Sequence, residues 1–309
     1  MIRVGASAPG KALLCGEYAV LDGAPAVVAA VGRRAIARWS DGPEAMSLEV
    51  AATLERACAL LGDVPGSLTI DATELRRDDV KLGLGSSAAG AAASAAAVFA
   101  SHGEDLRDES VRSRVFECAL AGHEAVAPSG SGVDVVASTF GGFRRFGRDP
   151  EIRSRALSIP DGLHVRLVWT GHAARTSDLV AKVRRLEGTH PKLFGATMGT
   201  LARLAEEFAD AFERGRTSDG VELAGKYGTA MGNLGNAASA PIVEERLAHA
   251  ARLAKVHGGA AKPCGAGGGD VAIAFFADAQ AANAFELACG TEGLHPIDVS
   301  FGEAGVQAQ

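Results

Sequence analysis

The chain has 309 residues, of which 47% are hydrophobic, 22% charged and 5% aromatic, and its formal net charge is −6. This length accommodates one large or two ordinary domains, and the composition is that of a soluble globular protein. The acidic balance, without a basic stripe, argues against nucleic acid as the main partner.

Cysteine use and hydropathy indicate the compartment. The five cysteines are dispersed singly, with no CxxC pair and no zinc-type spacing. This pattern predicts reduced, mostly buried thiols. No signal peptide is recognisable, and the alanine run at residues 91–100 is too short and too weakly hydrophobic to span a bilayer. We therefore expect a cytoplasmic enzyme without a membrane partner.

The first half of the chain predicts a mixture of strands and helices. Residues 2–8 are typical of a strand that stops at Pro9-Gly10, and the valine-rich run 24–39 is expected to bend into paired strands. The alanine run that follows the central glycines favours a helix. This run covers residues 90–100. The other expected helices in this half are 43–61 and 109–126, and the other expected strands are 67–70 and 140–146.

The second half of the chain is richer in helical patterns. The expected helices are 179–186, 193–212, 221–234, 242–256 and 279–288, and the expected strands are 163–169, 271–276 and one near Ile297. The composition changes near residues 155–165, which suggests domains at 1–160 and 161–309 that share a cleft.

The most informative segment is Lys81-Leu-Gly-Leu-Gly-Ser-Ser-Ala-Ala89. A glycine turn that leads into a helix presents unpaired backbone N–H groups and the positive end of the helix dipole. This arrangement suits a phosphate. Ser86 and Ser87 can cap the helix, donate hydrogen bonds to a phosphate or ligate magnesium.

Two further glycine clusters accompany this turn. One begins at Ala8-Pro-Gly-Lys11 and continues to Gly16-Glu17-Tyr18, and the other is Lys262-Pro-Cys-Gly-Ala-Gly-Gly-Gly-Asp270. A single such cluster is more often only a turn. Three in one chain, each near a Lys, Ser or Asp, favour a site where backbone approaches a ligand closely.

Two common nucleotide-binding patterns fit less well. Gly83-Leu-Gly-Ser-Ser-Ala88 matches the GxGxxA dinucleotide fingerprint, but that fingerprint follows an apolar strand, whereas residues 76–81 here are polar and charged. The pattern GxxxxGK[ST] is absent, which excludes an ordinary P-loop NTPase. A Rossmann reductase remains an alternative of low weight.

The clusters, in this order, resemble the GHMP kinase superfamily over essentially the whole chain. They are most similar to phosphomevalonate kinases: Gly16-Glu-Tyr18 has Tyr where mevalonate kinases usually have His, and the last cluster ends in Asp270. The resemblance implies an α+β fold of two domains, an N-terminal ribosomal-protein-S5-like α/β domain and a C-terminal ferredoxin-like α+β domain, with the active site in the cleft.

The resemblance also implies roles for individual residues, with ATP and Mg²⁺ as cofactors. Gly130-Ser-Gly-Val-Asp134 looks like the segment of the catalytic aspartate. On local sequence alone, Lys11 is equally well a solvated loop lysine and Asp134 a helix cap. The implied residues are Lys11 and Asp134 for catalysis; Gly83, Leu84, Gly85, Ser86, Ser87 and Ala88 for the nucleotide; Ser87 for the metal; and Glu17, Tyr18, Ser129, Ser131, Arg144, Lys262, Gly267 and Gly268 for the acceptor.

Two features depart from the phosphomevalonate kinase pattern. Asp22-Gly-Ala-Pro25 reads more like the mevalonate kinase version of its loop. In mevalonate kinases a Glu upstream of the catalytic Asp helps to hold magnesium, and here that position falls on His123, next to Glu124. Which carboxylate completes the metal site is therefore open.

The resemblance implies phosphorylation of 5-phosphomevalonate to the diphosphate, in the mevalonate route of isoprenoid biosynthesis, by a monomer or homodimer. The alternatives are a mevalonate kinase, another small-molecule kinase of the superfamily, and a nucleotide-binding protein without turnover.

Overall fold

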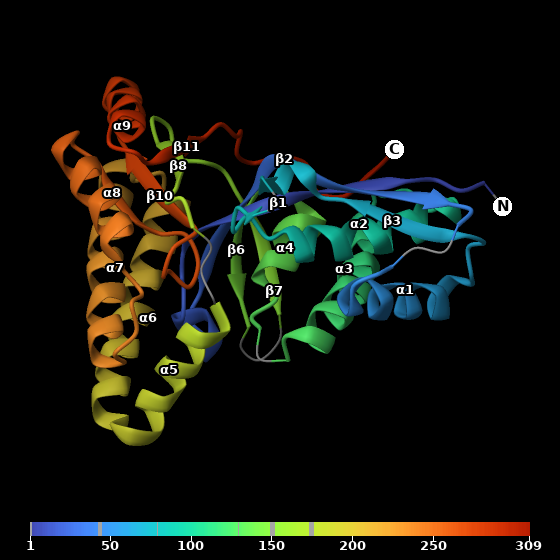
Figure 1. The fold of residues 1–309 in the computed structure, drawn as a ribbon, viewed down its shortest axis with the longest axis horizontal. Coiled ribbons are helices and arrows are strands. Elements are labelled where there is room, and N and C mark those ends of the chain that lie inside the picture. Colours follow the sequence, from blue (N-terminus) through green and yellow to red (C-terminus); the bar gives the residue numbers. More distant parts are fainter. Residues whose placement is uncertain (1, 43–44, 79, 129, 149–151, 173–175) are drawn as a thin grey trace. The chain divides into compact units, whose positions relative to one another are not determined.

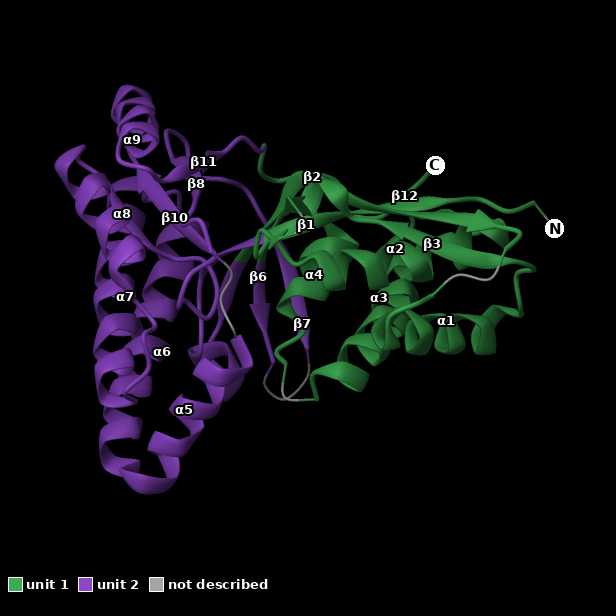
Figure 2. Ribbon diagram, viewed as in Figure 1, with its two compact units in different colours: residues 1–11, 28–144, 300–309 green, residues 12–27, 145–299 purple. Residues whose placement is uncertain are grey.

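A computed structural model describes residues 2–42, 45–78, 80–128, 130–148, 152–172 and 176–309 (Figure 1). The chain divides into two compact units (Figure 2): unit 1 comprises residues 1–11, 28–144 and 300–309, and unit 2 comprises residues 12–27 and 145–299. Each unit thus combines segments that are far apart in the sequence. The sequence predicts two domains, each contiguous in the chain, with a boundary at residue 160, and this division stays a prediction.

Among its described residues, unit 1 contains a large sheet, the two-stranded sheet β4-β5 and four α-helices. Three strands carry residues of both units: β1 (Ala6–Cys15), β2 (Ala26–Ser40) and β6 (Phe143–Gly147). The other elements are α1 (Leu48–Leu61), β3 (Ser67–Asp71), η2 (Thr73–Leu75), β4 (Arg76–Arg77), β5 (Val80–Lys81), α2 (Ser86–Ser101), α3 (Glu109–Val126), α4 (Val133–Phe140) and β12 (Gln307–Ala308). Antiparallel pairs join β1 to β12 and β2 to β3.

Helix α2 forms the centre of unit 1. Thirteen of its sixteen residues are buried, and it packs against α1, α3, α4, β3 and β12. Alanine side chains keep its surface narrow on every side, so that neighbouring backbones can approach closely. The larger side chain of Phe99, near the C-terminal end of α2, is buried in the same core. The alanine run therefore predicts a helix correctly, and its burial explains why the run carries no polar stripe.

Two sequence predictions of strand ends were wrong. The first strand does not stop at Pro9-Gly10 but continues to Cys15, and all ten of its residues are buried. Proline's fixed φ is compatible with extended backbone, so packing outweighs the local turn signal. A Cβ on Gly10 would lie 2.6 Å from the Leu84 carbonyl oxygen, so this glycine permits close packing.

The run predicted as paired strands is the single strand β2, Ala26–Ser40. Gly32 lies within this strand, and the space where its Cβ would lie is taken up by the Ser300 hydroxyl oxygen at 2.2 Å. The Gly32 N–H also donates to the Ser300 carbonyl at 3.0 Å. The glycine accommodates the C-terminal segment and does not form a turn.

Unit 2 combines a second sheet with five helices among its described residues. The elements are η1 (Ala19–Asp22), β7 (Arg153–Leu157), β8 (His164–Trp169), α5 (Thr176–Thr189), α6 (Pro191–Glu213), α7 (Thr217–Ala237), α8 (Glu245–Val256), β9 (Ala260–Pro263), β10 (Val271–Phe276), α9 (Ala279–Thr291) and β11 (His295–Ile297). The sheet has the order β11-β8-β10-β9 and is antiparallel throughout.

Both faces of β10 are covered, which explains its unbroken apolar sequence. On one face, Phe276 packs against Phe285 of α9 in a core that also contains α8 residues. On the other, Phe275 contacts Phe208 of α6 with ring centroids 5.8 Å apart. Among the described residues, no helix is long and apolar enough to cross a membrane.

The packing of α2 predicts a strong penalty for any larger side chain. We expect Ala93→Leu to lower the free energy of unfolding by about 1–3 kcal/mol, because the added carbons must displace the packed neighbours. Urea denaturation measures this. The matched control is Ala59→Leu at an exposed position of α1, and equal midpoints for the two variants would contradict the account.

Candidate active site

The glycine–serine turn lies at the N-terminus of α2. Gly83 and Gly85 have φ angles of 74° and 76°, which side chains rarely adopt, and α2 begins directly after Gly85. The buried Leu82 and Leu84 anchor the turn. The Lys11 N–H of β1 donates to the Leu84 carbonyl at 2.8 Å, so the turn is also fixed to β1 by backbone.

Gly85 lies against the two residues that the sequence predicts as catalytic. A Cβ on Gly85 would be 2.9 Å from Lys11 Cγ and 3.7 Å from Asp134 Oδ2. Lys11 Nζ lies 3.6 Å from Asp134 Oδ1, and the lysine side chain is 7% exposed against 32% for the aspartate. The structure therefore brings Lys11, Asp134 and the glycine–serine turn together in unit 1.

Asp134 lies in the first turn of α4, which begins after Gly132 with its φ of 80°. A carboxylate there is stabilised by the positive end of the helix dipole. The Ser131 hydroxyl accepts from the Val133 N–H at 3.3 Å and helps to start the helix. Ser131 thus lies close to Asp134 in the chain, whereas Ser129 lies outside the described residues.

A pocket of about 210 Å³ lies beside the first turns of α2, within unit 1. Ser86 and Ser87 line it, and Ser87 is exposed. Lys81 Nζ lies 3.4 Å from the Ser87 hydroxyl oxygen. The pocket combines cationic and apolar walls and is lined by Ala45, Met46, Ser47, Val50, Leu68, Ile70, Ala72, Arg76, Lys81, Ser86, Ser87 and Gly90.

His123 of α3 is held by a buried carboxylate. Its Nδ1 lies 3.3 Å from Glu49 Oε1, and a Cβ on Gly130 would be 2.5 Å from its Nε2. The hydrogen bond with Glu49 raises the pKa of His123, against burial, which lowers it, and the negative charge of Asp134 adds to the increase. His123 therefore supports the loop that leads to Asp134.

A second group of predicted site residues lies together in unit 2. Glu17 and Lys262 form an ion pair with side chains 1% and 0% exposed. The Tyr18 hydroxyl donates to the Ala266 carbonyl at 2.6 Å. The segment from Gly16 to Tyr18 is thereby fixed to the third glycine cluster.

The glycines of the third cluster are required by the protein's own packing. A Cβ on Gly267 would lie 2.1 Å from the Ile242 carbonyl oxygen, and one on Gly268 would lie 2.8 Å from Leu179 Cδ1. In contrast, nothing lies within 4 Å of a Cβ built on Gly265. The loop is therefore backed by protein at Gly267 and Gly268 and open at Gly265.

The two arginines after α4 have different surroundings. Arg144 donates from Nε to the Gly141 carbonyl at 3.1 Å and stacks on Phe140, and burial lowers its pKa. Arg145 pairs with three carboxylates of α6, among them Asp210 at 2.7 Å. Arg144 and Arg145 are consecutive residues of β6, so their side chains point to opposite sides of the strand. Arg175, another candidate for the acceptor phosphate, lies outside the described residues.

Sequence reasoning missed two residues of these clusters. Tyr227 of α7 donates its hydroxyl to the Glu17 carbonyl at 2.7 Å, and Glu49 of α1 pairs with His123. Tyr227 is one of only two tyrosines in the chain; the other, Tyr18, belongs to the segment to which Tyr227 is bonded. Nothing in the sequence around Glu49 distinguishes it from an exposed helix residue.

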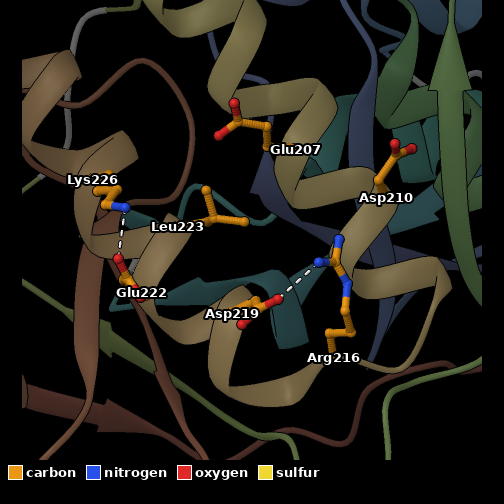
Figure 3. A pocket seen from close by; sticks show the side chains of 7 residues that line it. All are labelled: Glu207, Asp210, Arg216, Asp219, Glu222, Leu223 and Lys226. Carbon is orange, nitrogen blue, oxygen red and sulfur yellow. Dashed lines mark hydrogen bonds and ion pairs between the residues drawn. The ribbon is translucent and has the colours of Figure 1, made fainter.

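A larger pocket, of about 290 Å³, lies between α6 and α7 (Figure 3). Its lining residues are Glu207, Asp210, Arg216, Asp219, Glu222, Leu223 and Lys226. Each charged side chain already has a partner of opposite sign, such as Lys226 with Glu222 and Arg216 with Asp219. These mutual pairs are typical of a solvated helix surface.

The oxygen donors near the turn fit a magnesium ion that arrives with a nucleotide. Within the described ranges, no three His, Cys, Asp or Glu side chains converge on a metal position. Mg²⁺ usually keeps several waters and takes one or two carboxylates together with substrate phosphates. The Ser87 hydroxyl and the partly exposed Asp134 carboxylate meet this modest requirement.

Comparison with known proteins shows which kinases this chain is similar to. Residues 50–142 match the GHMP kinases N terminal domain. The chain is 29% identical over 340 residues to a phosphomevalonate kinase of Streptomyces sp., covering 89% of this chain and 90% of the relative. It is 28% identical over 307 residues to a mevalonate kinase of Aeropyrum pernix, covering 91% of each.

A solved structure has a similar fold. It is the phosphomevalonate kinase of Streptococcus pneumoniae in complex with phosphomevalonate and AMPPNP, with a TM-score of 0.81 at 19% identity, covering 97% of this chain and 100% of that chain. The resemblance and the α+β GHMP kinase fold predicted from the sequence are confirmed. The chain is therefore similar to kinases of the GHMP superfamily. Its relatives include both phosphomevalonate and mevalonate kinases.

The His123–Glu49 pair predicts a pH dependence of stability. Because the folded state raises the pKa of His123, the pair contributes fully below the unfolded pKa of about 6.5, and its contribution is lost as pH rises through the folded value. We expect His123→Gln to lose roughly 1–2 kcal/mol near pH 5.5 and much less near pH 9. Urea denaturation across this range measures it, with His190→Gln as the exposed control. Parallel stability curves for His123→Gln and wild type would contradict the prediction.

Proposed function

We propose that this protein catalyses the ATP-dependent phosphorylation of 5-phosphomevalonate to 5-diphosphomevalonate. The observation that carries the proposal is the contact of Lys11 and Asp134 with Gly85, in the turn at the N-terminus of α2. The most similar curated sequence among the relatives above, from Streptomyces sp., is a phosphomevalonate kinase and supports this choice of acceptor.

The α2 N-terminus supplies the binding energy for the nucleotide phosphates in this proposal. The first backbone N–H groups of a helix have no intrahelical partner and point toward an anion in front of it. Residues 83–88 provide these groups, and Lys81 adds a positive charge beside Ser87. The apolar part of the adjoining pocket, including Val50, Leu68 and Ile70, suits the nucleoside.

Lys11 and Asp134 act on the group that is transferred. Phosphoryl transfer depends mainly on positioning and charge neutralisation. Lys11 is held between Gly85 and Asp134, so its ammonium group neutralises charge that develops on the transferring oxygens. Ser87 and Asp134 would hold a magnesium ion together with the nucleotide phosphates, and the ion would add to this neutralisation.

The acceptor determines whether Asp134 has to accept a proton. A phosphate monoester has a second pKa of about 6 and is mostly ionised at neutral pH. Little proton transfer is then needed, and the main role of Asp134 is to orient Lys11. An alcohol acceptor needs a general base, which usually contributes about 10²–10⁴-fold.

A mevalonate kinase is the second candidate. The relative from Aeropyrum pernix is one, at nearly the same identity as the phosphomevalonate kinase. Asp134 at the start of α4 is placed equally well for a general base. One coupled assay of ADP release separates the two: we expect turnover with 5-phosphomevalonate and little with mevalonate, and the reverse preference would sink the first proposal.

Substitution of Asp134 tests the chemistry independently of the acceptor preference. With 5-phosphomevalonate we expect Asp134→Asn to lower kcat by about a hundredfold or less and to leave the shape of the kcat–pH profile unchanged. A larger loss, together with removal of an acidic limb from the profile, would assign a strong base to this position.

Substitution of Lys11 is expected to be more damaging. Lys11→Met removes the charge but keeps the length of the stem that packs on Gly85, and we expect kcat to fall by roughly 10²–10³-fold. The KM for ATP should change far less, because the α2 N–H groups remain. The control is Lys192→Met in an exposed part of α6, which should retain wild-type kinetics.

A further inference from the structure

A buried ion pair in unit 2 joins segments 245 residues apart in the sequence. Lys262 and Glu17 pair with each other, and their side chains are 0% and 1% exposed. Lys262 Nζ also donates to the Pro263 carbonyl at 2.9 Å and lies 5.8 Å from the centre of the Tyr227 ring. The cation is therefore enclosed by groups that can stabilise it.

Two further hydrogen bonds join the same two segments, and a third fixes residues 16–18 to α7. The Gly265 N–H donates to Glu17 Oε1 at 3.3 Å, and the Tyr18 hydroxyl donates to the Ala266 carbonyl at 2.6 Å. The Tyr227 hydroxyl donates to the Glu17 carbonyl at 2.7 Å. The first two bonds hold residues 16–18 against the start of the third glycine cluster, and the Tyr227 bond holds Glu17 against α7.

A buried ion pair is an unfavourable choice for a contact whose only role is to stabilise the fold. Replacing a buried ion pair by apolar residues of similar volume is often neutral or stabilising. In addition, Glu17 Oε2 is buried with no hydrogen-bond partner among the described residues. Tyr18 has a φ of 61°, a strained value for a residue with a side chain. Both features indicate that the geometry of these loops is held at the expense of stability.

We propose that Glu17 and Lys262 are positioning residues, which fix residues 265–269 against residues 16–18 so that the open side of the glycine cluster is ordered for the acceptor. Neither side chain touches substrate, because both are fully buried. Tyr227 belongs to the same device through its bond to the Glu17 carbonyl. The inference rests on the proposed kinase function only where its test measures kinetics.

The first test is the double variant Glu17→Met/Lys262→Met, which removes both charges and keeps the volume. We expect a melting temperature close to that of wild type. In the substrate-free protein, amide hydrogen exchange of residues 265–269 should be at least about tenfold faster, because the charged acceptor for the Gly265 N–H is gone. The KM for the acceptor should rise by about tenfold or more, with the KM for ATP within about twofold.

The second variant is Tyr227→Phe, which removes one hydroxyl from a buried ring and therefore keeps the fold. It should accelerate exchange in residues 265–269 by about threefold or more, since Glu17 loses one of its anchors. The matched control is Glu222→Gln/Lys226→Met, an exposed ion pair on α7 of the same unit (Figure 3). This control should leave both exchange and kinetics unchanged.

Wild-type exchange rates and a wild-type acceptor KM in the double variant would overturn the proposal. If that variant does not fold, unchanged exchange in Tyr227→Phe overturns it equally. Absence of kinase turnover in the wild type with either acceptor would refute the proposed function instead. The exchange measurements, made without substrates, would still decide whether the pair orders the loop.

Discussion

The candidate site in unit 1 depends on how closely one strand approaches one turn. The Lys11 N–H reaches the Leu84 carbonyl at 2.8 Å, and the space beside Gly85 is filled by the Lys11 side chain. A side chain at position 85 would displace the lysine, so a single missing Cβ determines where the ammonium group lies. The backbone hydrogen bond fixes the position of the turn, and the turn fixes the Lys11 ammonium group beside Asp134.

The chain handles its two important lysines in different ways. Lys11 is almost buried but faces a partly exposed carboxylate at 3.6 Å, so water and an incoming anion can reach the pair. Lys262 is sealed in the core with Glu17 and cannot bind a ligand directly. We therefore propose a chemical role for Lys11, which solvent can reach, and a positioning role for Lys262, because the desolvation of a buried charge is compensated in only one arrangement.

Much of the fold followed from local pattern, and the errors came from long-range packing. The helix after Gly85 was predictable because an alanine run has few alternatives. The continuation of β1 past Pro9-Gly10 and the single unbent strand β2 were not, since a glycine such as Gly10 is typical of a turn whether it bends the chain or admits a neighbour. Similarly, the glycines at 267 and 268 suggested ligand contact, while their immediate neighbours are Ile242 and Leu179.

The sequence by itself determined the resemblance to the GHMP kinase superfamily, the glycine turn that leads into a helix, and the candidates Lys11 and Asp134, because these depend on residue types at short, fixed spacings. Tertiary structure alone decided which polar groups face each other. It joined Glu17 to Lys262 and Tyr227, and it placed Glu49 against His123. Such partners are distant in the chain, and only the folded backbone, by excluding water from their surroundings, makes their pairing obligatory.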